Sequence, residues 1–240
     1  MTLIVALEGK DGLVLAADSR GTIGDPRGLT AVNDIQHKLF KLTNHCGIAI
    51  SGSSELAARL IDQLKPQLAA KTNVDDILSL VSSFCKTQYQ QWFGNRPWVS
   101  PTPVVDQRPT VAFIVCGYTN GQSMNSQSRI YILTSVLDFV PQLCQSGFMM
   151  AGIPQYATYL IHRLYDRSMN IKSLQSLAAY LITETATQDP KVGGPVRIAT
   201  ITPNSGYGEL SEEAIQSIVT LNDKQSRGLK QFFFSSGETK

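Results

Sequence analysis

The sequence has no apolar run near the roughly 20 residues that a membrane-spanning helix needs. It also has no basic residues ahead of the apolar stretch at its amino terminus, where a secretory signal carries its positive charge. Neither sign of charge dominates, because 21 Lys and Arg residues offset 19 Asp and Glu residues to leave a net charge of +2. These absences argue against a membrane or a nucleic acid as partner, and we expect a cytoplasmic protein.

Cysteine is scarce and scattered. The four cysteines stand singly, with no C-x-x-C pair among them, at Cys46, Cys85, Cys116 and Cys144. Neither a disulfide framework nor a zinc site is indicated by that distribution, and the three histidines do not cluster at metal-ligand spacing. We therefore expect buried free thiols, no metal and no cofactor.

Strand-like runs begin almost at the first residue. Apolar residues form 42% of the chain, enough for a sizeable core. The runs 2–8 and 13–18 are rich in β-branched and aliphatic residues, and the Asp11-Gly12 turn between them predicts a tight hairpin. Residues 21–28, which hold Gly and Pro, are predicted to form a loop. Further strands are expected over 38–42, 47–51, 110–118, 129–134, 145–151 and 196–202, with a weaker one over 214–221. Asn44-His45 is expected to supply the turn between the first two of these.

Four segments show the 3.6-residue apolar period of helices. The first begins near Ser53, with Ser53 or Ser54 available as its N-cap. The second follows Asn73, with Asp75 and Asp76 in its first turn, and two more cover 155–167 and 171–187. Strands and helices thus occur in separate groups, without the alternation of a doubly wound parallel sheet. This order predicts an α+β fold in which helix pairs flank two antiparallel sheets. The expected result is a four-layer αββα sandwich, as a single domain over residues 1–240.

The start of the first strand could carry chemistry. If Met1 is removed, Thr2 presents a hydroxyl and a free α-amine on one carbon. An α-amine titrates about 2.5 units below a lysine, so it can accept a hydroxyl proton near neutral pH. One residue would then supply both nucleophile and base.

Three charged residues are candidates to assist Thr2. In a hairpin turned at residues 9–12, the end of the second strand lies beside the start of the first, which brings Asp18 near Thr2. Arg20 follows that strand, and Lys38 opens the third. Taken singly, each is an ordinary turn or ion-pair residue. The joint pattern is what indicates a site.

The chain resembles a known family at several of these segments. Those that carry the resemblance are Thr2, Leu15-Ala16-Ala17-Asp18-Ser19-Arg20, His37-Lys38-Leu39-Phe40-Lys41-Leu42 and Ile50-Ser51-Gly52-Ser53. Together they resemble the proteasome subunit family of N-terminal nucleophile hydrolases, and the similarity extends more loosely to Gly193-Gly194. The α-type subunits of that family carry an extra helix before the hairpin. This chain begins with the strand itself, so it is most similar to the β-type and bacterial proteasome-like proteases.

The resemblance implies a role for each matching residue. It makes Thr2 the nucleophile, Asp18 the acid that orients the lysine, and Lys38 the group that sets the proton affinity of the threonine. Arg20 would support that cluster. The backbone N–H of Gly52 would be the oxyanion donor, and Asp189 would belong to the extended site.

The resemblance also implies a substrate pocket. Gly21, Ile50 and Ser54 would line the pocket for the residue that precedes the scissile bond, and Ile50 at its base would favour an apolar guest. The alternative is that Ile50 simply packs its strand against a helix.

Two positions depart from the family pattern. Ala151 and Val192 stand where the family has serines that support the terminal amine and a bound water. Such changes could leave full activity, a slow enzyme, or a peptide ligase in which an amine replaces the attacking water.

We therefore expect a threonine-type peptidase that acts on peptides or unfolded proteins through an acyl-enzyme. The alternative is a weak or inactive ring-forming scaffold subunit. The resemblance further implies a homo-oligomer, as a ring or a stacked assembly, with an ATPase or related subunit as a potential partner.

Overall fold

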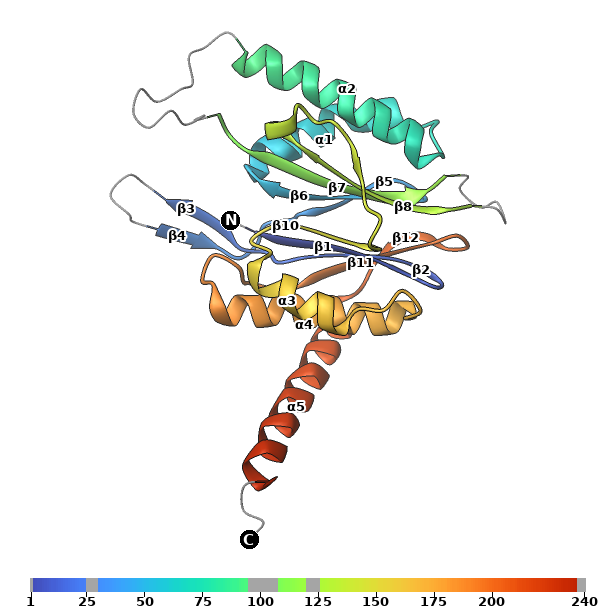
Figure 1. Ribbon diagram of the computed structural model, residues 1–240. Helices are drawn as coiled ribbons and strands as arrows, with labels where there is room; N and C mark the ends of the chain where they lie inside the picture. The colour runs from blue at the N-terminus through green and yellow to red at the C-terminus, as the bar shows by residue number, and fades with distance from the viewer. Residues whose placement is uncertain (1, 25–29, 95–107, 120–125, 237–240) are drawn as a thin grey trace.

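The chain forms four layers of secondary structure in a computed structural model that describes residues 2–24, 30–94, 108–119 and 126–236. Helices α1 (Ser54–Leu68) and α2 (Val74–Phe93) cover the outer face of one sheet. Helices α3 (Gln155–Leu164) and α4 (Ile171–Gln188) cover the outer face of the other (Figure 1). The predicted αββα sandwich is confirmed.

Both large sheets are antiparallel and contain five strands each. The first has the order β10-β1-β2-β11-β12, with bounds Phe148–Gly152, Leu3–Gly9, Gly12–Ala17, Arg197–Thr202 and Gly206–Glu209. The second has the order β5-β6-β7-β8-β9, with bounds Leu39–Thr43, Cys46–Gly52, Val111–Tyr118, Ser128–Thr134 and Gln142–Leu143. A short 3₁₀ turn, Ser135–Leu137, separates the last two.

Strand β1 lies at the centre of the sandwich. Its residues from Leu3 to Leu7 are all fully buried. Leu3, Val5 and Leu7 belong to the core beneath α3 and α4, whereas Ile4 and Ala6 belong to the core between the two sheets. Because both faces of the strand are covered, an unbroken apolar run suits it better than an alternating one. The same burial places the first residues of β1 deep in the molecule.

The predicted amino-terminal hairpin is confirmed. Gly9 pairs with Gly12 across the turn, and Ile4 pairs with Ala17 at the other end. The second predicted turn is also present, since Thr43 pairs with Cys46 around Asn44-His45. The register therefore brings the end of β2 back to the start of β1.

Helix α2 begins after Asn73, as predicted, and Asn73 caps it. The side chain of Asn73 accepts a hydrogen bond from the backbone N–H of Asp75 at 2.8 Å. Asp75 and Asp76 occupy the first turn, where the helix dipole favours negative charge. Ser53, predicted as a cap of α1, makes no such side-chain hydrogen bond.

The prediction of a loop over 21–28 was wrong for its described part. Strands β3 (Gly21–Gly24) and β4 (Thr30–Asn33) form a separate two-stranded sheet, while residues 25–28 lie outside the described ones. Glycines at both ends of β3 suggested a loop, but Thr22 and Ile23 between them pair with Val32 and Ala31.

The weak strand predicted over 214–221 was also wrong. Helix α5 (Glu212–Ser236) occupies this segment. Ile215, Ile218 and Val219 are spaced for one helix face and pack on the core beneath α4. The apolar run is too short to reveal its period by itself. Within the described residues, no helix combines the length and the apolar composition that crossing a membrane requires.

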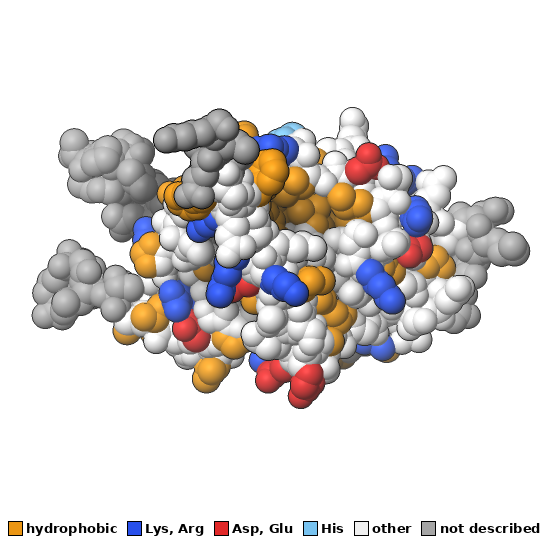
Figure 2. All heavy atoms as spheres, turned by 90° about the horizontal axis from the view of Figure 1, so that it is seen from below, with side chains coloured by type: hydrophobic (Ala, Val, Ile, Leu, Met, Phe, Trp, Pro, Cys, Tyr) orange, Lys and Arg blue, Asp and Glu red, His pale blue; other side chains and the backbone are white. Residues whose placement is uncertain are grey.

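Helix α5 projects from the body of the molecule beneath α3 and α4 (Figure 1). The view from that side shows Lys and Arg side chains interspersed with Asp and Glu, with apolar side chains between them (Figure 2). This face therefore carries charge of both signs.

Candidate active site

Asp18 is the centre of a buried polar cluster where β2 ends. Its side chain is fully buried, and both of its oxygens accept hydrogen bonds. Oδ1 accepts from the Leu3 N–H at 3.1 Å and from Lys38 Nζ at 2.8 Å. Oδ2 accepts from the N–H groups of Arg20 at 3.2 Å and Gly193 at 3.1 Å. Four donors thus compensate the burial of this carboxylate.

Lys38 is the cation of this cluster, and its side chain is 1% exposed. Nζ also donates to the carbonyl oxygen of Arg20 at 2.7 Å. Burial lowers the pKa of the Lys38 ammonium, and the charge of Asp18 opposes that effect. Since Lys38 and the Leu3 N–H share one oxygen of Asp18, the ammonium lies close to the first residues of β1.

Thr2 immediately precedes β1 and is 4% exposed. Its carbonyl accepts from the Ile153 N–H at 2.8 Å. Gly152, on the neighbouring strand, has a φ of +98°, and a Cβ there would lie 1.8 Å from the Thr2 carbonyl oxygen. Only glycine allows this close approach. The Thr2 carbonyl is therefore held closely against the end of β10.

Thr2 borders a pocket of about 290 Å³. The pocket is lined by Thr2, Gly21, Thr22, Ile23, Gln36, Gly52, Ser53, Ser54 and Glu55. These residues come from the start of β1, from β3, from the segment before β5, and from the junction of β6 with α1. The structure thus brings together four residues singled out from the sequence, namely Thr2, Gly21, Gly52 and Ser54.

Gly52 ends β6 with a φ of +92°. A Cβ at this position would lie 2.2 Å from the carbonyl oxygen of Thr110, so a larger residue would displace the neighbouring strand. The Ser53 N–H donates to that same carbonyl at 2.8 Å. Gly52 lines the pocket beside Thr2, a position that suits its predicted role as oxyanion donor. That role stays a prediction.

Ile50 differs from expectation. It is 1% exposed and packs in the core among β6, α1 and α2, and it is not among the residues that line the pocket. The same hydrophobic cluster includes Ala57, Leu60 and Ile61 of α1. This position agrees with the alternative interpretation, in which Ile50 packs its strand against a helix. The pocket beside Thr2 therefore lacks the expected isoleucine at its base.

Asp189 lies on the segment that follows α4. Its carboxylate accepts from the Lys191 N–H at 2.8 Å, and Asp189 is not among the residues lining the pocket. The same segment reaches the cluster through the Gly193 N–H, which donates to Asp18. The predicted role of Asp189 in an extended site stays a prediction.

Both positions that depart from the family pattern are buried and apolar. Ala151 is 7% exposed and lies in the core between the sheets. Val192 is fully buried in the core beneath α3 and α4. Neither side chain can donate a hydrogen bond, so neither can hold an amine or a water as a serine would.

Arg20 connects the cluster to a partner that sequence reasoning missed, Asp34. The guanidinium binds the Asp34 carboxylate with two hydrogen bonds, from Nε at 2.7 Å and from Nη2 at 2.8 Å. Nη1 donates to the Pro190 carbonyl at 3.0 Å. The hydrogen bond from Arg20 lowers the pKa of Asp34. No sequence pattern marks Asp34, because an acidic residue after an asparagine is typical of an ordinary turn.

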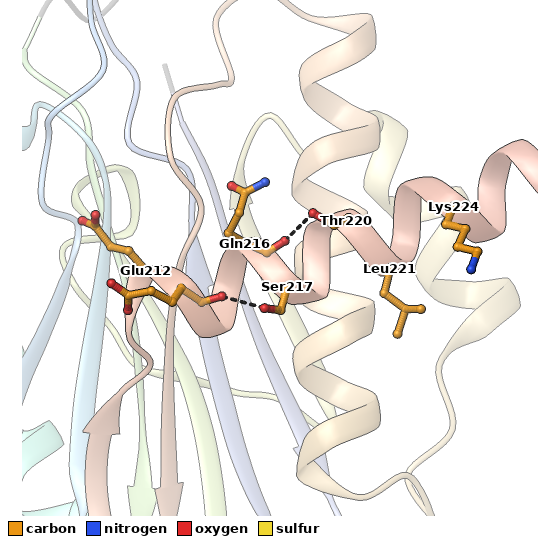
Figure 3. A pocket seen from close by; sticks show the side chains of 7 residues that line it. Glu212, Gln216, Ser217, Thr220, Leu221 and Lys224 are labelled. Atoms are coloured by element: carbon orange, nitrogen blue, oxygen red, sulfur yellow. Dashed lines mark hydrogen bonds between the residues drawn. The ribbon is translucent and has the colours of Figure 1, made fainter.

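A larger hollow than the pocket at Thr2 lies elsewhere, along α5 (Figure 3). Its volume is about 820 Å³, and it is lined by Glu212, Glu213, Gln216, Ser217, Thr220, Leu221 and Lys224. The hydroxyls of Ser217 and Thr220 donate to the carbonyls of Glu213 and Gln216 one turn earlier, at 2.9 and 2.8 Å. All of these residues belong to one surface helix. The groove offers no activated nucleophile, so the pocket at Thr2 is the better candidate.

The chain is similar in sequence to proteasome subunits. The family described as "Proteasome subunit" matches residues 2–98. Proteasome subunit beta 1 of Thermococcus kodakarensis is 24% identical over 226 residues, which cover 91% of this chain and 96% of that protein. Proteasome subunit beta of Methanothermobacter thermautotrophicus is 24% identical over 230 residues, which cover 92% and 96%.

Among solved structures, an Anbu (Gly-1) mutant from Hyphomicrobium sp. strain MC1 has the same fold, with a TM-score of 0.72 at 15% identity. The match covers 100% of this chain and 98% of that one. The chain is thus similar in sequence to proteasome β subunits over most of its length, and it shares the fold of this solved structure.

Proposed function

We propose that this protein is a threonine peptidase in which Thr2 is the nucleophile. The observation that carries the proposal is the position of Thr2. It lines an open pocket on one side, and the next residue, Leu3, donates to the buried Asp18–Lys38 pair on the other. A nucleophile needs access to substrate and a fixed charge nearby, and this position offers both.

The free α-amine of Thr2 would act as the base, which requires the removal of whatever precedes it, Met1 included. The amine takes the hydroxyl proton while Oγ1 attacks the peptide carbonyl. The tetrahedral intermediate collapses by breaking the C–N bond, and the ammonium returns a proton to the departing amine. Water, deprotonated by the same amine, then attacks the ester and releases a carboxylic acid and free Thr2.

The buried pair supplies the electrostatic help that a threonine hydroxyl needs. The Lys38 ammonium favours the developing alkoxide, and it lowers the proton affinity of the nearby amine. Asp18 keeps the lysine in one place through the hydrogen bond at 2.8 Å. The Gly52 N–H would stabilise the oxyanion, a type of contribution worth about 3 kcal/mol of barrier.

Two observations favour a second function. Ala151 and Val192 cannot support an amine or a water, which would slow hydrolysis of the ester and leave a ligase or a scaffold. Incubating the protein with an acyl donor and a competing amine separates these functions. A ligase partitions the acyl group to the amine, whereas a peptidase releases mainly the acid and a scaffold turns over neither.

The family also supports proposals about assembly. Proteasome β-type relatives suggest a homo-oligomer, a peptide or unfolded-protein substrate, and a cytoplasmic location. An ATPase or a related subunit would be a natural partner for such an assembly.

The intact mass of the purified protein, measured before and after exposure to a β-lactone or epoxyketone, tests the nucleophile. We expect loss of Met1 and one adduct mapped to Thr2. Thr2→Ala should form none, whereas Thr220→Ala, on the remote and exposed face of α5, should still form it. An adduct on the Thr2→Ala variant, or no adduct on wild-type protein that lacks Met1, would contradict the proposal.

A further inference from the structure

The pocket beside Thr2 is polar. Its lining side chains other than Thr2 include two hydroxyl-bearing serines, a threonine, an amide and a carboxylate, from Ser53, Ser54, Thr22, Gln36 and Glu55. Ile23 at the edge of the pocket is the apolar side chain among them, and it is 65% exposed. An apolar guest would bury these polar groups without hydrogen bonds, which costs free energy.

Glu55 is the charged residue among those that line this pocket. It lies in the first turn of α1, where the helix dipole stabilises a carboxylate. Across the described parts of the chain, no ion pair involves Glu55. Arg59, one turn further along, instead lies over the Trp92 ring, 4.9 Å from its centroid. The Glu55 carboxylate therefore has no cationic partner within residues 2–24, 30–94, 108–119 and 126–236, and it can pair with a cation of the guest.

The other charges near Thr2 do not neutralise Glu55. The ammonium of Lys38 is buried and is paired with Asp18 at 2.8 Å. The guanidinium of Arg20 is held by the Asp34 carboxylate in two hydrogen bonds. The described side chains therefore give the pocket a net negative charge toward its guest.

Gln36 adds a second acceptor, and the fold holds it in place. Its backbone N–H donates to the Ser19 carbonyl at 3.0 Å. Its side-chain amide lies against Gly21, where an added Cβ would be 2.4 Å from the Gln36 Cδ. Glycine at position 21 thus leaves the space that this amide occupies.

We propose that this pocket takes the side chain of the residue that precedes the scissile bond, and that it selects lysine or arginine there. Glu55 is the specificity-determining carboxylate, and the Gln36 amide oxygen accepts a second hydrogen bond from the guest. The aliphatic stem of the guest lies along Ile23 while its charged end reaches the acceptors. This inference rests on the proposed peptidase function.

Four fluorogenic peptides that differ only in the residue before the scissile bond test the selectivity, with Arg, Lys, Gln or Leu at that position. The protein is first shown by intact mass to lack Met1. We expect kcat/KM to be higher for Arg and Lys than for Leu. Because the Glu55 carboxylate is exposed, we expect the isosteric Glu55→Gln change to reduce that preference about threefold, and Glu55→Lys to reverse it.

Glu213→Gln is the matched control. Glu213 is also an exposed carboxylate in the first turn of a helix, α5, but it lies in the groove away from Thr2. This variant should keep the wild-type preference. A preference for Leu in the wild-type protein, or a preference for Arg that Glu55→Gln leaves unchanged, would overturn the inference.

A binding measurement separates failure of this inference from failure of the peptidase proposal. Non-cleavable amides of the Arg and Leu peptides are titrated into Thr2→Ala and into Thr2→Ala/Glu55→Gln by calorimetry. Arg should bind more tightly than Leu to the first protein but not to the second. Binding selectivity without any cleavage by wild-type protein overturns the peptidase and leaves the pocket assignment standing. Cleavage by wild-type protein without such binding selectivity overturns the pocket assignment and leaves the peptidase proposal standing.

Discussion

Lys38 and Asp18 form an ion pair that is buried on both sides, with Nζ 2.8 Å from Oδ1 and side chains 1% and 0% exposed. The desolvation of two charges often exceeds what their attraction returns, so apolar residues would serve a core at least as well. This pair is instead surrounded by further hydrogen bonds from Leu3, Arg20 and Gly193. Such a costly arrangement directly beside Thr2 favours a catalytic use.

Removing the lysine alone should harm both stability and activity. Lys38→Met leaves the Asp18 carboxylate buried without its cation, and we expect a loss of about 3 to 5 kcal/mol in the free energy of unfolding. Denaturant unfolding and the rate of adduct formation at Thr2 measure the two effects. The double variant Asp18→Asn/Lys38→Met removes both charges, so it should regain much of the stability while acylation stays lost. A double variant that reacts like wild type would refute the role of the pair.

The pH dependence of acylation should report the environment of Lys38. Burial lowers the pKa of Lys38 below its ordinary value of 10.5, so the cation is lost at a lower pH than in a free lysine. We expect the rate of adduct formation to fall on the alkaline side at a pH below 10.5. In Lys38→Arg that alkaline fall should be absent, because arginine keeps its charge. Circular dichroism at each pH confirms that both proteins remain folded.

The lowered pKa of Lys38 also predicts how its contribution to the free energy of unfolding changes with pH. Between the lowered pKa of folded Lys38 and the value of 10.5 for an ordinary lysine, the unfolded chain binds more protons than the folded one. The Lys38 contribution to the free energy of unfolding therefore rises with pH through that interval. The difference between wild type and Lys38→Met, followed by denaturant unfolding from neutral pH upward, should increase. A decrease would mean that the folded state raises the pKa of this lysine.

Asp34 should act as a positioning residue through Arg20. Its carboxylate holds the guanidinium of Arg20, whose backbone in turn contacts both Asp18 and Lys38. We expect Asp34→Asn to lower kcat for peptide cleavage while KM changes little, because the substrate pocket is left intact. Arg20→Lys, which cannot reproduce the two parallel hydrogen bonds, should have a similar effect.

The control for Asp34 is Asp223→Asn, which removes a carboxylate from an exposed arginine pair on α5, at 3.4 Å from Arg227. It should leave both kinetic constants unchanged. A rise in KM with constant kcat in Asp34→Asn would assign Asp34 to substrate binding instead.

Gly152→Ala should displace Thr2. An added Cβ would lie 1.8 Å from the Thr2 carbonyl oxygen, and the φ of +98° disfavours any other residue. We expect a lower melting temperature, from strain of about 1 to 3 kcal/mol, and loss of the adduct at Thr2. Gly228→Ala is the matched change, because a Cβ there meets no atom within 4 Å and alanine suits a helix such as α5. A Gly152→Ala protein that reacts at the wild-type rate would contradict the close approach described for Thr2.

The local patterns of the chain were sufficient for most of the architecture. The hairpin turn over residues 9–12, the Asn44-His45 turn and the start of a helix after Asn73 depend on neighbouring residues, and all three occur as predicted. The strand predicted over 214–221 was wrong, because a short β-branched run has no clear period. Packing beneath α4 makes this segment a helix.

The sequence by itself determined the hairpin that returns Asp18 to Thr2, because a two-residue turn and the pleat of the strands set that register. It also determined which residues could carry the chemistry, namely Thr2, Asp18 and Lys38. Only the tertiary structure decided that Asp34 holds Arg20, that Ile50 belongs to the core, and that Glu55 lines the pocket. Those contacts join segments that are separated along the sequence and that meet only when the chain folds. Which side chains touch there depends on tertiary packing, and no local sequence pattern specifies it.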